Sequence, residues 1–145
     1  MIGPRIRHPV FHVPFDYRID RARRCVLSTG RGEFSYRDAK AHMDRLSADP
    51  EFDPTFSQLI DFAGITKVTL SHDEIYDLSS RHVFASDARR AFVTTTMEQF
   101  GLARMFQSYR AAKGETGIRV FTVMEEALVW LELKTGDPPG PTLAL

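Results

Sequence analysis

The chain has 145 residues, of which 43% are hydrophobic and 26% charged, and its formal net charge is zero. This composition is typical of one globular domain, and a neutral chain has no overall attraction to nucleic acid or to anionic membranes. We therefore expect no nucleic-acid partner. Cys25 is the single cysteine, which excludes an intrachain disulfide and a cysteine metal cluster, and its apolar neighbours predict a buried thiol.

The two ends of the chain differ in composition from the middle. Prolines interrupt the N-terminal segment, which lacks the long apolar core of a signal peptide. The sequence has no run of about eighteen apolar residues, so we expect no transmembrane segment and a cytoplasmic protein. We divide the chain into an N-terminal arm at 1–15, one domain at 16–134, and a flexible tail rich in glycine and proline at 135–145.

Two strands and a helix are predicted in the first third of the chain. Residues 16–29 are expected to form two strands joined by a charged turn at Asp20–Arg24, and the glycines at 30–34 should end the second strand. A helix is predicted at 35–49, because apolar side chains recur there at three- and four-residue steps: Tyr36, Ala39, Met43 and Leu46.

Strands and helices alternate over the rest of the chain. Two Asp-Pro pairs mark 49–56 as a connection, since proline disfavours helix in the residue before it. Apolar segments predict strands at 57–64, 90–96 and 117–123. Apolar periodicity predicts helices at 71–85, 97–112 and 124–133, the first with Ile75, Leu78, His82 and Ala85 on one face, the second with Leu102, Met105, Phe106 and Tyr109.

A capping pattern occurs at each predicted helix start. A hydroxyl residue is followed three positions later by a side chain that can bond back to it: Ser35 with Asp38, Ser71 with Glu74, Thr96 with Gln99, and Thr122 with Glu125. The predicted order is therefore β-β-α-β-α-β-α-β-α. This alternation indicates an α/β fold with a mostly parallel sheet and helical cover, to which the first hairpin adds an antiparallel strand.

With this order, the sequence resembles the STAS superfamily, and within it the SpoIIAA-like bacterial domains related in fold to anti-sigma-factor antagonists. The similar features are the opening hairpin, "GRGEFS" before the first helix, "LIDFAGI" as a central strand, "FGLARMF" before a basic turn, and "RVFTVMEEALVWL" at the end. Gly32, Ser35 and Asp61 match positions that recur in that group. The resemblance covers about Tyr17 to Leu133 and implies a bacterial, non-enzymatic regulatory or protein-interaction domain.

The segment that enters the second predicted helix departs from the family pattern. Phosphorylated antagonists have an Asp-Ser-Ser-Gly type of run there, whereas this chain has "VTLSHDEI". Ser71 stands at the place of the phosphoacceptor, without the paired serine or the glycine. Ser71 is therefore either a regulatory serine, since phosphate is favoured at a helix N-terminus, or simply the helix cap.

Candidate site residues gather at the predicted carboxyl edge of the sheet, where ligands bind in open α/β folds. Asp61 lies at the end of a predicted strand, and threonines join another strand to a helix whose free amides favour an anion. The predicted switch or ligand edge comprises Asp61, Thr66, Thr69, Ser71, Thr94 and Thr95. Each of these residues also has an ordinary structural explanation, as a cap, a strand end or a hydrogen-bonding loop residue.

Other chemistries find no support in the sequence. Gly30 and Gly32 lack the third glycine of a dinucleotide loop, and no P-loop lysine follows them. The five histidines have neither helical metal-ligand spacing nor a cysteine pair beside them. Because no set of nucleophile, base and acid is recognisable, we expect no catalytic residues, no cofactor and no metal, and we rank an enzyme third among the functions.

Two hypotheses for function remain. The first is an interaction module that presents the segment Asp61–Ser71 and the second helix to a protein partner or to a second copy of the chain, with modulation at Ser71. The alternative is a domain that binds a small apolar, lipid-like or anionic ligand at the same edge, in a cavity of at least about 300 Å³. The following aromatic residues would form core, pocket or dimer face: Phe84, Phe92, Phe100, Phe106, Tyr109, Phe121 and Trp130.

Overall fold

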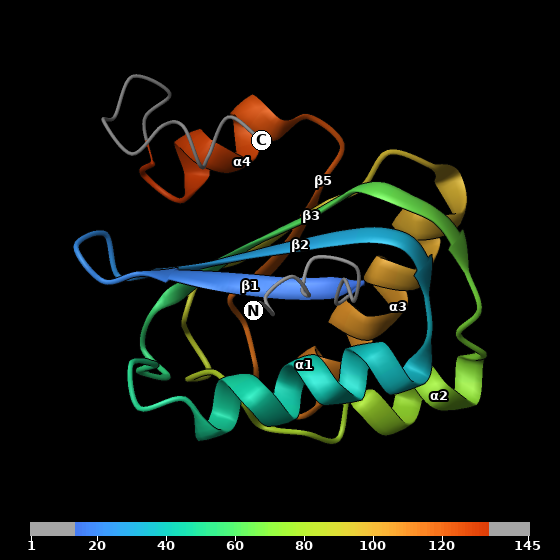
Figure 1. Ribbon diagram of the computed structural model, residues 1–145, viewed down its shortest axis with the longest axis horizontal. Helices are drawn as coiled ribbons and strands as arrows, with labels where there is room; N and C mark the ends of the chain where they lie inside the picture. Colours follow the sequence, from blue (N-terminus) through green and yellow to red (C-terminus); the bar gives the residue numbers. More distant parts are fainter. Residues whose placement is uncertain (1–13, 134–145) are drawn as a thin grey trace, which may run out of the picture.

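The computed structural model describes residues 14–133, which form a five-stranded sheet and four helices (Figure 1). In chain order the elements are β1 (Phe15–Asp20), β2 (Cys25–Phe34), α1 (Tyr36–Ala48), β3 (Ser57–Val68), α2 (His72–Leu78), β4 (Arg90–Val93), α3 (Met97–Ala112), β5 (Ile118–Phe121) and α4 (Met124–Trp130). This is the predicted order. Apart from Pro14 and Phe15, the predicted arm at 1–15 and tail at 135–145 lie outside the described residues.

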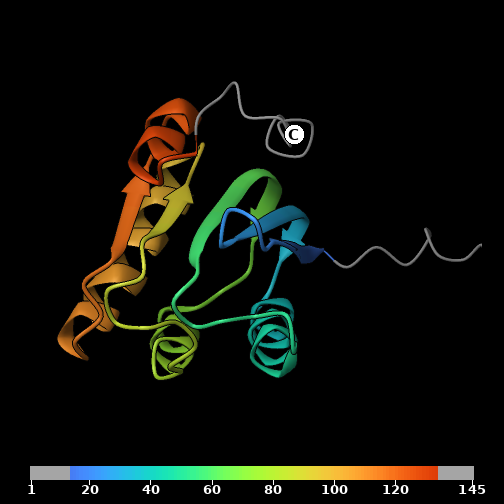
Figure 2. The same ribbon diagram turned by 90° about the vertical axis from the view of Figure 1, so that its left-hand side faces the viewer.

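The sheet has the strand order β1-β2-β3-β4-β5, so sequence neighbours are also neighbours in space. β1 and β2 pair antiparallel across the charged turn, and the pairs β2–β3, β3–β4 and β4–β5 are parallel. Helices α1, α2 and α3 cover one face of the sheet, and α4 lies on the other (Figure 1 and Figure 2). The predicted α/β class with a mostly parallel sheet and helical cover is confirmed.

The prediction that glycines end the second strand is wrong, because β2 continues through them to Phe34. Two register shifts in its pairing with β3 accommodate the irregular backbone, one between Thr29 and Arg31 and one between Gly32 and Glu33. Gly32 has a φ of 68°, which glycine adopts without the steric penalty that other residues pay. The partner strand β3 is longer than predicted as well, since it remains paired with β2 over the same stretch.

Helix α2 is much shorter than the predicted range 71–85. The hydroxyl groups of Ser79 and Ser80 donate to carbonyl oxygens of the last helical turn, and such local bonds compete with continuation of the helix. His82 and Ala85 therefore lie in the connection to β4 rather than on a helical face. β4, β5 and α4 are also a few residues shorter than predicted.

Three of the four predicted helix caps are present. Ser35, Ser71 and Thr96 each accept a hydrogen bond from the amide three residues later, and Ser71 forms a complete capping box. The prediction for Thr122 is wrong. The cap residue of α4 is Val123, whose side chain makes no capping hydrogen bond, so Thr122 lies one residue too early to cap the helix.

Both faces of the sheet are buried under apolar side chains. The core beneath α1, α2 and α3 includes Phe15, Phe34, Ile60, Phe92 and Phe106. On the other face, residues of α4 pack on Cys25, Leu27, Leu59 and Ala91. Of the predicted aromatic set, Phe84, Phe92 and Phe106 are buried. In the described part of the chain, no helix has the length and apolar character needed to cross a membrane.

Candidate functional site

The residues of the predicted switch or ligand edge have separate, local contacts. Asp61 lies inside β3 rather than at its end, and its Oδ1 accepts a 2.9 Å hydrogen bond from the amide of Ala63. Thr66 is exposed on the same strand. The hydroxyl of Thr69 donates to the carbonyl oxygen of Phe34. These contacts shape the β2–β3 extension.

Ser71 and the threonines after β4 are likewise engaged in local structure. The Oγ of Ser71 accepts from the amide of Glu74 at 3.1 Å, and the Glu74 carboxylate accepts from the amide of Ser71 at 2.9 Å. Thr94 is fully buried and donates to a carbonyl oxygen of β5, and Thr95 donates to a glutamine side chain in the first turn of α3. Among residues 14–133, no hydrogen bond joins Asp61, Ser71 and Thr95.

A cavity of about 90 Å³ lies between the sheet and helices α1, α2 and α3. Apolar side chains form most of its wall, including Phe15, Ile60, Leu78, Phe84, Phe92, Ala103 and Phe106. Four polar side chains also line it: His42, Gln58, Arg90 and Gln99. The cavity is smaller than the volume of about 300 Å³ expected for a ligand pocket. Among the described residues, none of the six residues of the predicted edge lines the cavity, whereas Phe62 and Leu70, the chain neighbours of Asp61 and Ser71, do.

One polar group of the cavity is a neutral histidine. His42 is 3% exposed and stacks on the ring of Phe15, with the two ring centroids 4.3 Å apart. Its Nε2 lies 2.9 Å from Oγ of Ser28, which also accepts a 3.1 Å hydrogen bond from Nε2 of Gln58. Burial, and then the charges of nearby arginines, lowers the pKa of His42 to about 3. The ring is therefore uncharged near neutral pH.

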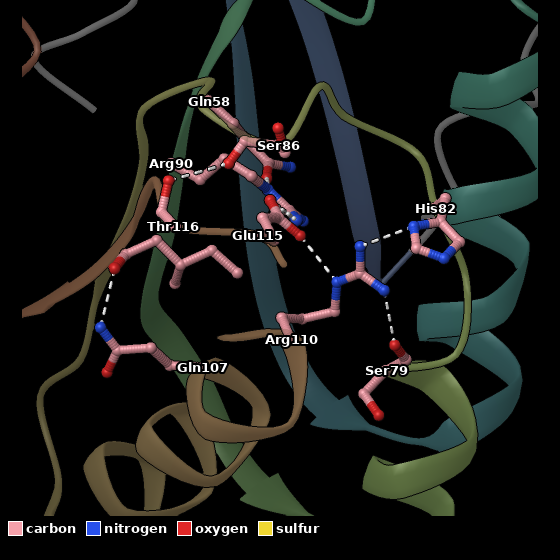
Figure 3. Close-up of polar contacts among 10 residues, drawn as sticks. Gln58, Ser79, His82, Ser86, Arg90, Gln107, Arg110, Glu115 and Thr116 are labelled. Atoms are coloured by element: carbon pink, nitrogen blue, oxygen red, sulfur yellow. Dashed lines mark hydrogen bonds and ion pairs between the residues drawn. The ribbon is translucent and has the colours of Figure 1, made fainter. Parts of the chain in front are cut away.

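A buried cluster of three charged side chains begins at the cavity wall (Figure 3). Arg90 of β4, Arg110 of α3 and Glu115 are 6%, 2% and 3% exposed. Oε2 of Glu115 lies 2.9 Å from Nη1 of Arg90, and its Oε1 lies 2.7 Å from Nε of Arg110. As Figure 3 shows, Arg110 also reaches the carbonyl oxygen of Ser79, at 2.7 Å, and Nδ1 of His82, at 3.0 Å. The cluster links β4, α3 and the connection after α2.

The cluster places a cation beside an apolar cavity. Two guanidinium groups and one carboxylate leave it with a net charge of +1. Burial lowers the pKa of Arg90 while Glu115 opposes this shift, and a guanidinium remains protonated in proteins. The Cζ atom of Arg90 lies 4.3, 5.5 and 5.9 Å from the ring centroids of Phe84, Phe92 and Phe106, and all three rings also line the cavity.

Gly117 permits the close backbone approach that positions the cluster. Its carbonyl oxygen accepts a 2.9 Å hydrogen bond from the amide of Arg90, which starts the β4–β5 pairing. A Cβ atom at position 117 would lie 1.9 Å from the carbonyl oxygen of Ala88, so a larger residue requires backbone movement. Glycine therefore sets the spacing between the two strands on which the Arg90–Glu115 contact depends.

Sequence reasoning did not identify this cluster. The sequence does contain one signal for the buried position of Arg90. Alternate residues of a strand face the same side, and Arg90 is two residues before Phe92 in β4. An arginine thus occupies a core position in a strand that is otherwise apolar. Gln58 occupies a similar position in β3. Glu115 follows α3 in a connection, and nothing local in the sequence indicates that it meets Arg90.

The single thiol and the histidines form no further site in the described part of the chain. Cys25 is buried, as predicted, and burial raises the pKa of its thiol to about 11, so the thiolate form is scarce near neutral pH. Within residues 14–133, no group of histidine, cysteine and carboxylate side chains is arranged to hold a metal ion. His8 and His12 lie outside the described residues.

Comparisons with known proteins concern the fold. A scan against protein-family models finds no match, and a search of curated proteins finds none either. Among solved structures, the chain is similar to an uncharacterized protein of the DUF3478 family from Shewanella loihica PV-4, described as having a SpoIIAA-like fold. The two are 18% identical with a TM-score of 0.49, and the match covers 73% of this chain and 82% of that chain.

Proposed function

We propose that this protein is a cytoplasmic, non-enzymatic domain that binds a small, largely apolar ligand in the cavity between the sheet and helices α1, α2 and α3. The cavity itself carries the proposal, because apolar side chains line most of it and a few polar groups converge on it, as in small-molecule sites. Its volume of about 90 Å³ is roughly three times the share of one water molecule in the liquid. The ligand is therefore much smaller than the drug-sized molecules that occupy pockets of about 300–1,000 Å³.

The titratable groups near the cavity support binding rather than catalysis. A general base that works near neutral pH needs a pKa close to that pH, whereas the pKa of His42 is about 3. A guanidinium keeps its proton, so Arg90 supplies a fixed charge and no proton transfer. The thiol of Cys25 belongs to the core on the opposite face of the sheet.

Xenon is a direct probe of this proposal, because it enters apolar cavities of this kind. Methyl NMR spectra recorded under xenon pressure should show shifts concentrated at methyl groups of the cavity wall, such as those of Ile60 and Leu78. Ala103→Leu extends a side chain into the cavity and should abolish the shifts. Ala111→Leu, at an exposed position of the same helix, should leave them unchanged. Absence of shifts in the wild-type protein, or their persistence in Ala103→Leu, would contradict the proposal.

A feature of β3 favours a second candidate, the interaction module predicted for Asp61–Ser71. β4 pairs with β3 over Gln58–Asp61, whereas β2 pairs with it as far as Val68. Beyond Asp61, one edge of β3 has no neighbouring strand among the described residues, and another chain can add to such an edge. Gln99 covers part of it by donating to two of its carbonyl oxygens.

Self-association is the form of this interaction that requires no identified partner. Sedimentation velocity over a range of concentrations would compare the wild-type protein with Ser71→Asp and Ser71→Ala. A dimer whose affinity changes in Ser71→Asp and not in Ser71→Ala supports an interaction module modulated at Ser71. The same sedimentation for all three proteins counts against modulated self-association. A change in Ser71→Ala that Ser71→Asp does not share is explained by loss of the helix cap alone.

A further inference from the structure

The charge cluster at the cavity wall is unbalanced within the described residues. Glu115 supplies one negative charge between Arg90 and Arg110, and all three side chains are more than nine-tenths buried. An uncompensated charge is strongly disfavoured in a protein interior. The cluster therefore favours an additional anion beside one of its two guanidinium groups.

Arg90 is the arginine with an unused donor. Arg110 has an acceptor for each of its three nitrogens, namely Glu115, the carbonyl oxygen of Ser79 and Nδ1 of His82. Arg90 donates from Nε to Gln58 and from Nη1 to Glu115, while its Nη2 has no hydrogen-bond partner among residues 14–133. The unused donor thus belongs to the guanidinium that lines the cavity.

The surroundings of Arg90 define the chemistry of an anion that could pair with it. Among the described residues that line the cavity, Arg90 is the one charged side chain. A cluster charge of +1 matches a monoanion, whereas a dianion such as phosphate would leave excess negative charge in an apolar environment. A carboxylate is well matched to the donors of a guanidinium, and the organic part of the same molecule can occupy the apolar space.

We infer that the ligand is a small monocarboxylate whose carboxylate group pairs with Arg90 while its aliphatic part fills the apolar cavity. Gln58 and Glu115 hold the guanidinium by accepting from Nε and Nη1, at 3.0 and 2.9 Å, which leaves Nη2 available to the ligand. The inference rests on the proposed ligand-binding function and adds the chemical class of the ligand.

Isobutyrate and isobutyramide are a matched pair of probes, since they share a carbon skeleton and differ in charge. Titrations followed by methyl NMR near neutral pH, at constant ionic strength in chloride, should show isobutyrate binding at least about tenfold more tightly. Arg90→Met should reduce this preference to less than about twofold. Arg119→Met, which removes an exposed arginine of β5, should leave the preference unchanged.

The other outcomes separate this inference from the proposed function. Equal binding of the two probes overturns the monocarboxylate inference and leaves ligand binding intact. Xenon shifts without binding of either probe likewise overturn the monocarboxylate inference and leave ligand binding intact. Absence of both xenon shifts and probe binding overturns the inference and the proposed function together. A preference for isobutyrate that persists in Arg90→Met overturns the role of Arg90.

A second readout uses the wild-type protein and so does not depend on the folding of Arg90→Met. The Nε–Hε resonance of Arg90 in nitrogen-15 spectra reports on its guanidinium. Isobutyrate should shift this resonance together with the cavity methyl resonances, and isobutyramide should shift it much less. If isobutyrate shifts the methyl resonances and leaves the Arg90 resonance in place, the carboxylate does not pair with Arg90.

Discussion

Oε2 of Glu115 lies 2.9 Å from Nη1 of Arg90, and both side chains are buried. The same carboxylate accepts from Nε of Arg110 at 2.7 Å, so one negative charge separates two guanidinium groups. β4, the last turn of α3 and the connection after α3 therefore meet at a single carboxylate. This arrangement makes the cluster sensitive to the loss of Glu115.

Glu115→Gln should lower the free energy of unfolding by about 3–5 kcal/mol, because it leaves two buried guanidinium groups without a counter-charge. Urea denaturation measures this change. Glu125→Gln is the control, since Glu125 is exposed in the first turn of α4, and it should cost less than about 1 kcal/mol. A loss in Glu115→Gln no larger than in the control would show that the cluster does not depend on its carboxylate.

His42 should make the protein less stable in acid. Its pKa is about 3 in the folded chain and 6.5 in an ordinary environment, so between these values the unfolded chain binds a proton that the folded chain does not. The stability associated with neutral His42 is fully present above pH 6.5 and falls as the pH decreases towards 3, by at most about 1.4 kcal/mol per pH unit.

Urea denaturation across this pH range tests the role of His42. His42→Gln removes the titrating group from the interior and should flatten the dependence of stability on pH. His72→Gln, at an exposed position, should retain the slope of the wild-type protein. If the three proteins have the same slope, burial of His42 is not the source of the acid sensitivity.

Gly117→Ala should destabilise the fold by about 1–3 kcal/mol or more, because its Cβ atom would overlap the backbone of Ala88 and push β4 from β5. Gly101→Ala is the matched control. Gly101 lies within α3, and a Cβ atom there would have no neighbouring heavy atom within 4 Å, so alanine should stabilise the helix by about 0.5–1 kcal/mol. The midpoints of thermal and urea denaturation should therefore fall in Gly117→Ala and rise in Gly101→Ala. Midpoints that move in the same direction in both variants would contradict this account.

Ser71→Ala should cost about 1 kcal/mol through loss of the α2 cap, whereas Ser71→Asp should nearly preserve stability, because aspartate caps helices as well as serine does. Thr122→Ala should change stability by less than about 0.5 kcal/mol, since Thr122 does not cap α4. Urea denaturation of the three variants distinguishes these cases. Equal losses in Ser71→Ala and Thr122→Ala would mean that the capping box contributes little.

Local sequence signals predicted those elements whose boundaries depend on local contacts. The α3 boundaries, Met97–Ala112, were predicted correctly, because Thr96 caps the helix and its apolar stripe ends before Gly114. The range of α2 was too long. Its apolar spacing continues past the actual end of the helix, but the hydroxyls of Ser79 and Ser80 bond to the last turn. Periodicity alone does not reveal that competition.

The order of the strands and helices, the α/β class and the buried Cys25 follow from periodicity, capping and composition, since each depends on residues close together in the chain. The cavity and its charge depend on contacts between distant residues. Arg90 and Glu115 are separated by 25 positions, and no local pattern indicates that β4 and the connection after α3 bring them together. Strand alternation shows on which side Arg90 lies; packing of three helices over that side makes it a buried cation beside an apolar space.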